Sequence, residues 1–181
     1  MLGRVRKFLP RNQLVMVYNA IVQPHFHYAS CVWSNTYAKY TGPLVALQAR
    51  AGRVILGAPK LTPTAQVLHD LNWTPMTARW QCQRAVMMYK VAGGLAPRYL
   101  TDCFTPLQET YSEGVRGTRG RSYRNYRPCS SGNNWGKRRF ASHGAYLWND
   151  LPPEIKSLEF ARYKSAIRSL GKCNFKFYSP I

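Results

Sequence analysis

Acidic residues are scarce in this sequence. Its 181 residues include 26 Lys and Arg against 7 Asp and Glu, a formal net charge of +19. Polymerases and many nucleases hold two catalytic metal ions with several convergent carboxylates. The closest acidic spacings, Glu109 with Glu113 and Asp150 with Glu154, provide no such cluster. We therefore expect no metal site and no cofactor, and the charge favours polyanionic partners such as nucleic acid.

The signatures of other enzyme classes are also missing. The histidines, His25, His27, His69 and His143, accompany no Gly-x-Ser-x-Gly elbow and no cysteine-nucleophile signature. His25, His27 and Cys31 match no standard zinc spacing, and the chain has no phosphate-cradling glycine loop. We expect a chain that is not an enzyme on its own and has no small-molecule substrate.

Cysteine pairs and long hydrophobic runs are absent. The cysteines are odd in number, lie far apart and form no Cys-x-x-Cys pair: Cys31, Cys82, Cys103, Cys129 and Cys173. This pattern disfavours a disulfide framework and predicts reduced, mostly buried thiols. Hydrophobic runs such as Leu14–Tyr18 are far shorter than the roughly 20 residues that span a bilayer. With no signal peptide after Met1, we expect an intracellular protein without a membrane partner.

Apolar residues recur at helical intervals along much of the chain. Because proline suits a first helical turn and glycine the position after the last, both residue types help to set the boundaries. The predicted helices cover residues 14–22 between Pro10 and Pro24, a segment from Pro43 to Gly57, residues 64–71, residues 75–91 and residues 160–170. The sequence therefore predicts a mainly α fold, with room for minor β structure.

The stretch from Asn12 to Ala38 carries no formal charge. Such a stretch is typical of burial in a core or against another domain. The tryptophans Trp33, Trp73, Trp80 and Trp148 are predicted to be core residues rather than base-stacking residues.

Residues 114–149 contain eight basic side chains and no acid, interleaved with glycine, serine and asparagine. This composition predicts a flexible basic arm or a long loop. Its tyrosines and tryptophan, Tyr123, Tyr126 and Trp135, are candidates for stacking on bases while the cations neutralise phosphates. The alternative is a solvated basic linker. The candidate phosphate-binding residues here are Arg116, Arg119, Arg121, Arg124, Arg127, Lys137, Arg138 and Arg139.

A series of short motifs occurs in order along nearly the whole chain. They are Arg4 to Leu9 followed by Tyr18-Asn19; Leu47-Gln48-x-Arg50-Ala51-x-Arg53 with Gly57-Ala58-Pro59; Leu68 to Pro75; Gly94-Leu95-Ala96-Pro97-x-Tyr99-Leu100; and Leu147-Trp148-Asn149-x-Leu151-Pro152. Together they resemble the region C-terminal to the catalytic palm in reverse transcriptases of non-LTR retrotransposons, of the jockey and chicken-repeat LINE type.

The resemblance implies a helical, thumb-like domain over residues 1–108, a basic flexible segment over 109–139 and a C-terminal segment with a terminal helix over 140–181. The aspartate-containing motif of the palm and an endonuclease domain are absent. The resemblance therefore implies a non-catalytic fragment of an RNA-directed DNA polymerase. The full-length parent would need Mg²⁺ in its palm.

In this family the thumb holds the template and primer, so the resemblance assigns phosphate contacts to Arg4, Arg6, Lys7, Arg50 and Arg53. The implied partners are RNA, DNA or an RNA/DNA hybrid and the palm domain, and the implied location is the nucleus. Two alternatives remain: a retroelement-derived protein-interaction module that recruits a partner through residues 12–38, or a non-functional remnant.

Overall fold

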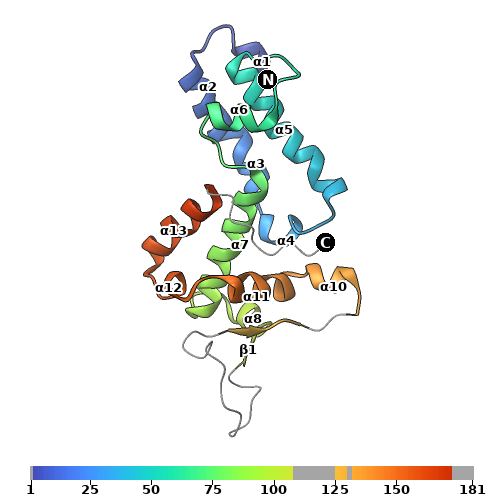
Figure 1. Cartoon of the computed structure of the whole chain (residues 1–181), viewed down its shortest axis with the longest axis vertical. Helices are drawn as coiled ribbons and strands as arrows, with labels where there is room; N and C mark the ends of the chain where they lie inside the picture. Colours follow the sequence, from blue (N-terminus) through green and yellow to red (C-terminus); the bar gives the residue numbers. More distant parts are fainter. Residues whose placement is uncertain (1, 108–124, 130–131, 173–181) are drawn as a thin grey trace, which may run out of the picture. The chain divides into compact units, whose positions relative to one another are not determined.

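The computed structural model describes residues 2–107, 125–129 and 132–172 (Figure 1). These residues are mainly helical with one two-stranded sheet, which confirms the predicted mainly α fold with minor β structure. The chain divides into two compact units, Met1–Trp80 and Gln81–Ile181, referred to as unit 1 and unit 2. The division falls inside one helix rather than near residue 108, because the second half of that helix packs with the C-terminal helices.

Unit 1 is a chain of helices (Figure 1). They are α1 (Leu2–Val5), α2 (Arg11–Val17), the π-helical turn η1 (Tyr18–Val22), α3 (Gln23–His27), α4 (Ser30–Trp33), α5 (Ala38–Leu56), α6 (Thr64–Asp70) and the first part of α7 (Met76–Ala92). The predicted helices at 64–71 and 75–91 correspond to α6 and α7.

The helical path that begins with α2 continues past Pro24, where the sequence predicts its end. Gln23 donates its backbone N–H to the carbonyl of Tyr18, five residues back, so the chain makes one π-type turn before the proline. Pro24 then falls in the first turn of α3, where a backbone N–H is not needed. Because of the wider turn, Pro24 does not end the helical path.

Helix α5 begins at Ala38, five residues before the predicted start at Pro43. Pro43 lies in the second turn, and Gly42 before it has no Cβ to clash with the proline ring. The predicted C-terminal end is confirmed: Gly57 is left-handed with φ 73°, and Ala58 donates its N–H to the Arg53 carbonyl at 3.0 Å. This pairing is the Schellman end of a helix, which favours glycine.

The core of unit 1 joins helices that are distant in sequence. Tyr18 stacks on Trp73 with ring centroids 4.3 Å apart, beside Leu14 and Ile55. Burial raises the pKa of the Tyr18 hydroxyl above its usual value. The buried Gln48 of α5 accepts the backbone N–H of Met76 at 2.9 Å and so satisfies a free donor at the start of α7.

Unit 2 contains the rest of α7 and the C-terminal elements. They are α8 (Arg98–Thr101), β1 (Thr105–Pro106), β2 (Tyr126–Arg127), α10 (Asn134–Arg138), α11 (Phe140–Asp150), α12 (Pro153–Lys156) and α13 (Phe160–Lys172). The strands pair antiparallel, with Thr105 opposite Arg127. Tyr163 of α13 donates its hydroxyl to the Ala85 carbonyl of α7 at 3.0 Å inside the shared core.

Two expectations about burial are only partly met. Trp73, Trp80 and Trp148 are buried as predicted, and Trp33 is half-buried. The thiols are not mostly buried, because Cys103 and Cys129 are exposed while Cys31 and Cys82 are half-buried. Cys173 lies outside the described residues.

Gly52 is expected to be essential for the packing of α5 on α6. A Cβ at this position would meet Val67 Cγ1 at 2.5 Å and Leu71 Cδ1 at 3.1 Å. We expect Gly52→Ala to lower the free energy of unfolding of unit 1 by about 1–2 kcal/mol, because overpacking outweighs the gain in helix propensity. Urea denaturation followed by circular dichroism measures this.

The control for that change is Gly3→Ala in α1, where a Cβ meets nothing within 4 Å. It should leave stability unchanged or raise it slightly. Equal stability of the two variants would contradict the close packing at Gly52.

Candidate nucleic-acid interface

Exposed cations gather where α1 meets the C-terminal end of α5 in unit 1. Arg4, Arg6 and Lys7 are exposed, and the guanidinium of Arg6 lies where a Cβ of Gly57 would be. The absent side chain of Gly57 therefore makes room for Arg6 beside the end of α5. We refer to Arg4, Arg6, Lys7, Arg50, Arg53 and Lys60 as the α5-end cluster.

Within this cluster, Arg53 also forms hydrogen bonds that stabilise the fold. Its Nε donates to the Thr62 carbonyl at 2.9 Å, and its Nη2 donates to the Thr64 hydroxyl at 3.3 Å. These bonds close the loop between α5 and α6. Arg50, one turn earlier on α5, is exposed. The two arginines that the resemblance treats alike therefore differ, since only Arg53 is held by the loop.

Lys60 is a cation that the sequence analysis did not select. It is exposed in the loop that Arg53 closes, two residues before Thr62. An isolated lysine in a loop gives no periodic signal, although its place three residues after the predicted helix end at Gly57 could have drawn attention to it.

Unit 1 contains almost no acidic side chains that could neutralise these cations. Residues 1–80 contain nine basic residues and one acid, Asp70, a formal net charge of +8. The Asp70 carboxylate lies 3.5 Å from Nδ1 of the neighbouring His69, and this contact is an ion pair only when the imidazole is protonated. Arg11 donates to the backbone carbonyl of Asp70 rather than to its carboxylate. The α5-end cluster is therefore a surface whose positive charge is not neutralised by unit 1.

The described part of the basic segment contains regular elements, the strand β2 and the helix α10. Arg127 is exposed on β2, and α10 presents Lys137 with Arg139 just beyond it. Arg138 is half-buried. Arg116, Arg119, Arg121, Arg124 and Tyr123 lie outside the described residues, as does the side chain of Trp135.

The prediction that Tyr126 stacks on bases is wrong. Its side chain is 4% exposed and meets the Phe104 ring edge-on, with centroids 5.7 Å apart. Its backbone is fixed by Asn149, which accepts the Tyr126 N–H at 3.0 Å and donates to its carbonyl at 2.8 Å. Because strand residues alternate between faces, Arg127 points outward where Tyr126 points inward.

A half-buried lysine supports the same corner of unit 2. Lys156 donates through Nζ to the Asn149 carbonyl at 3.2 Å and to Asn125 Oδ1 at 3.3 Å. Burial lowers the pKa of Lys156, and the nearby Asp150 opposes this shift. Lys156 is therefore a structural cation rather than one offered to a ligand.

Unit 1 also presents a strip of exposed apolar side chains. Met16, Ile21, Tyr28 and Val32, here named the apolar strip, are 68%, 46%, 82% and 79% exposed. Residues 12–38 are expected from the sequence to be buried in a core or against another domain, and for these four side chains the core of unit 1 is excluded. They lie on the uncharged stretch that the sequence analysis singled out.

Comparisons of this chain with models of protein families, with curated proteins and with solved structures found no match. Among the described residues, no group of three or more His, Cys, Asp or Glu side chains is arranged to hold a metal ion. No helix in the described ranges is long and apolar enough to cross a membrane.

The different tasks of Arg53 and Arg50 can be separated by substitutions that keep the charge. We expect Arg53→Lys to lower the free energy of unfolding of unit 1 by about 1 kcal/mol, because lysine cannot make both loop hydrogen bonds. Arg50→Lys should change it by less than about 0.5 kcal/mol. Urea denaturation of the two variants makes the comparison, and equal effects would show that the loop contacts are energetically unimportant.

Proposed function

We propose that this chain is a non-catalytic, nucleic-acid-binding part of a reverse transcriptase of the non-LTR retrotransposon type, corresponding to the thumb and the region after it. It grips RNA, DNA or an RNA/DNA hybrid by the phosphate backbone, next to a palm domain that supplies the chemistry. The α5-end cluster is the observation that carries this proposal, because its cations lie on and just after α1, on the last turns of α5 and in the loop after it, and residues 1–80 contain one acid against nine basic residues.

Preorganisation supports the proposal. Arg53 is fixed by two hydrogen bonds, and Arg6 lies against the space left by Gly57. A cation that is already held in place loses less side-chain entropy when it binds an anion. Arg50 and Lys60 add exposed positive charge beside them. The cluster therefore combines one guanidinium group held by hydrogen bonds, that of Arg53, with five exposed cations.

The contacts of such a surface are with phosphates and sugars rather than with base edges. Arginine and lysine side chains that approach the backbone position a protein on nucleic acid without reading its sequence. An RNA/DNA hybrid is A-like, and proteins recognise such duplexes by shape and backbone. We therefore expect little sequence preference. The proposal also implies a nuclear location, and the Mg²⁺ requirement belongs to the palm of the parent enzyme.

A second candidate function is supported by the apolar strip. Side chains such as Tyr28 and Val32 are more than three-quarters exposed, and exposed apolar patches mark interaction surfaces. In the first proposal the palm domain covers this strip. In the second, the chain is a protein-interaction module and its positive charge is incidental.

Fluorescence anisotropy with a labelled RNA/DNA hybrid, single-stranded RNA and duplex DNA tests the first proposal. With about four to eight phosphates neutralised, log affinity should fall against log salt with a slope of about −0.9 per phosphate for the duplexes and about −0.7 for the single strand. Hybrid or RNA should bind most tightly. Weak binding of all three ligands by the folded chain at physiological salt would place the interaction module first.

Single-charge variants locate the contact surface. Arg50→Gln and Lys60→Gln should each reduce the salt slope by about 0.9. The matched control is Lys39→Gln, at the opposite end of α5, where the lysine Nζ lies 4.9 Å from the Tyr40 ring centroid. It should leave the slope unchanged. A fall of equal size in the control would indicate an unlocalised charge effect.

The basic segment needs a separate variant. Deleting residues 114–139 would remove Tyr126 from the core of unit 2, so substitution is the better test. We expect the combined Arg116→Gln, Arg119→Gln, Arg121→Gln and Arg124→Gln variant to flatten the salt slope without lowering the stability of unit 2. An unchanged slope would exclude this segment from the interface.

A further inference from the structure

Helix α13 has two contrasting faces. Its apolar face is fully used by the core of unit 2: Tyr163 and Ile167 are completely buried, and Cys82 of α7 donates its thiol to the Ile167 carbonyl at 3.3 Å. Phe160 and Leu170 pack against the same core. Packing in the core of unit 2 thus accounts for the apolar residues that predict this helix. It does not account for the residues on the outward face.

The outward face carries two arginines around a strip of small residues. Its exposed side chains are Ala161, Arg162, Ser165, Arg168 and Ser169. At 3.6 residues per turn, Arg162 and Arg168 lie about 60° to either side of Ser165 and about 9 Å apart along the axis. The arginines therefore flank a low strip made of Ala161, Ser165 and Ser169.

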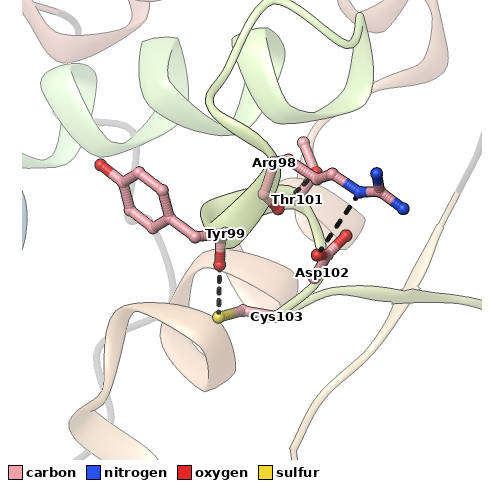
Figure 2. A network of polar contacts seen from close by, with 5 residues as sticks. All are labelled: Arg98, Tyr99, Thr101, Asp102 and Cys103. Carbon is pink, nitrogen blue, oxygen red and sulfur yellow. Dashed lines mark hydrogen bonds and ion pairs between the residues drawn. The ribbon is translucent and has the colours of Figure 1, made fainter.

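The two arginines form no ion pair in the described part of the chain, and α13 itself contains no acid. The acid nearest to them in sequence is Glu159, three residues before the first of them. Arg98 of α8 differs, because its Nε lies 4.0 Å from the Asp102 carboxylate one turn later (Figure 2). Lys164, at the border of the outward face, lies 4.4 Å from the Phe160 ring centroid. The charge on the outward face is available to an external anion.

The composition of this face distinguishes between anionic partners. A helix that lies on a membrane inserts large apolar side chains beside its cations. On α13 those side chains are in the core, and the outward face has none. Arginine guanidinium groups and serine hydroxyls are instead common donors to nucleic-acid phosphates. Small residues between the arginines allow a sugar–phosphate backbone to approach the helix closely.

We infer that the outward face of α13 is a second phosphate-backbone contact surface, on unit 2, with Arg162 and Arg168 as its principal cations. It rests on the proposed nucleic-acid function and extends it from the α5-end cluster to a separate helix. In this inference Ser165 and Ser169 lie in the strip that faces the sugar–phosphate backbone of the ligand. The Ser169 hydroxyl also donates to the Ser165 carbonyl at 3.1 Å.

The test is a salt titration of hybrid binding by the full chain. Arg162→Gln and Arg168→Gln should each reduce the salt slope by about 0.9, and Arg168→Lys should restore most of it because the charge remains. Arg98→Gln is the matched control in the same unit: it removes one positive charge that already faces Asp102, so the slope should not change. Circular dichroism checks that each variant is folded.

The outcomes separate this inference from the proposed function. A steep slope for the unaltered chain that persists in both α13 variants overturns the inference and leaves the α5-end cluster as the binding surface. Weak binding by the unaltered chain overturns both. A fall in the Arg98→Gln control equal to that of the α13 variants also overturns the inference. The inference is also overturned if the α13 variants lose binding to phosphatidylcholine vesicles containing phosphatidylserine while their binding to the hybrid is unchanged.

Discussion

The shortage of carboxylates constrains where the cations of this chain lie. With 26 basic and 7 acidic residues, most arginines and lysines cannot be neutralised by ion pairs. Several donate to backbone carbonyls instead. Arg11 binds the carbonyl of Asp70, Arg53 binds that of Thr62, and Lys156 binds that of Asn149. The first of these carbonyls lies at the end of α6, where a helix carries partial negative charge.

Hydrogen bonds to backbone carbonyls, in place of ion pairs with carboxylates, have a consequence for the charge of the protein. A guanidinium group bonded to a carbonyl keeps its full positive charge, whereas a bonded carboxylate would cancel it. Arg53 is therefore held in place and remains attractive to an anion. The remaining cations, such as Arg50 and Arg162, are left on exposed helix faces. A chain built in this way has a fold that tolerates its charge, together with exposed faces that carry positive charge.

Single residues predicted a helix boundary correctly where the boundary depends on the conformation of one helical turn. Gly57 ends α5 because only its backbone adopts the left-handed conformation at low cost, and the sequence alone indicates this. The boundaries at Pro24 and Pro43 were wrong for a different reason. The π-type turn of η1 and the missing Cβ of Gly42 make these prolines compatible with helix, and neither effect is visible in residue periodicity.

The site was harder to predict because its residues depend on tertiary contacts. Tyr126 is in a two-residue strand, too short to show an alternating pattern, and the asparagine that fixes it lies 23 residues later. Arg53 and Arg50 look equivalent in sequence, and only the loop carbonyl of Thr62 distinguishes them. Arg162 and Arg168 were overlooked because the C-terminal helix was judged by its apolar face. Its outward face becomes informative once the apolar face is known to be buried.

The two proposed phosphate-contact surfaces lie on units that share helix α7. In this proposal, a nucleic acid bound at one surface is tethered to the chain that carries the other. The second contact is then an intramolecular event with a high effective concentration. A strand long enough to reach both surfaces gains more affinity than either surface provides, whereas a shorter strand occupies one. If both surfaces contact phosphate, the length of the ligand rather than its sequence determines the affinity of the chain for it.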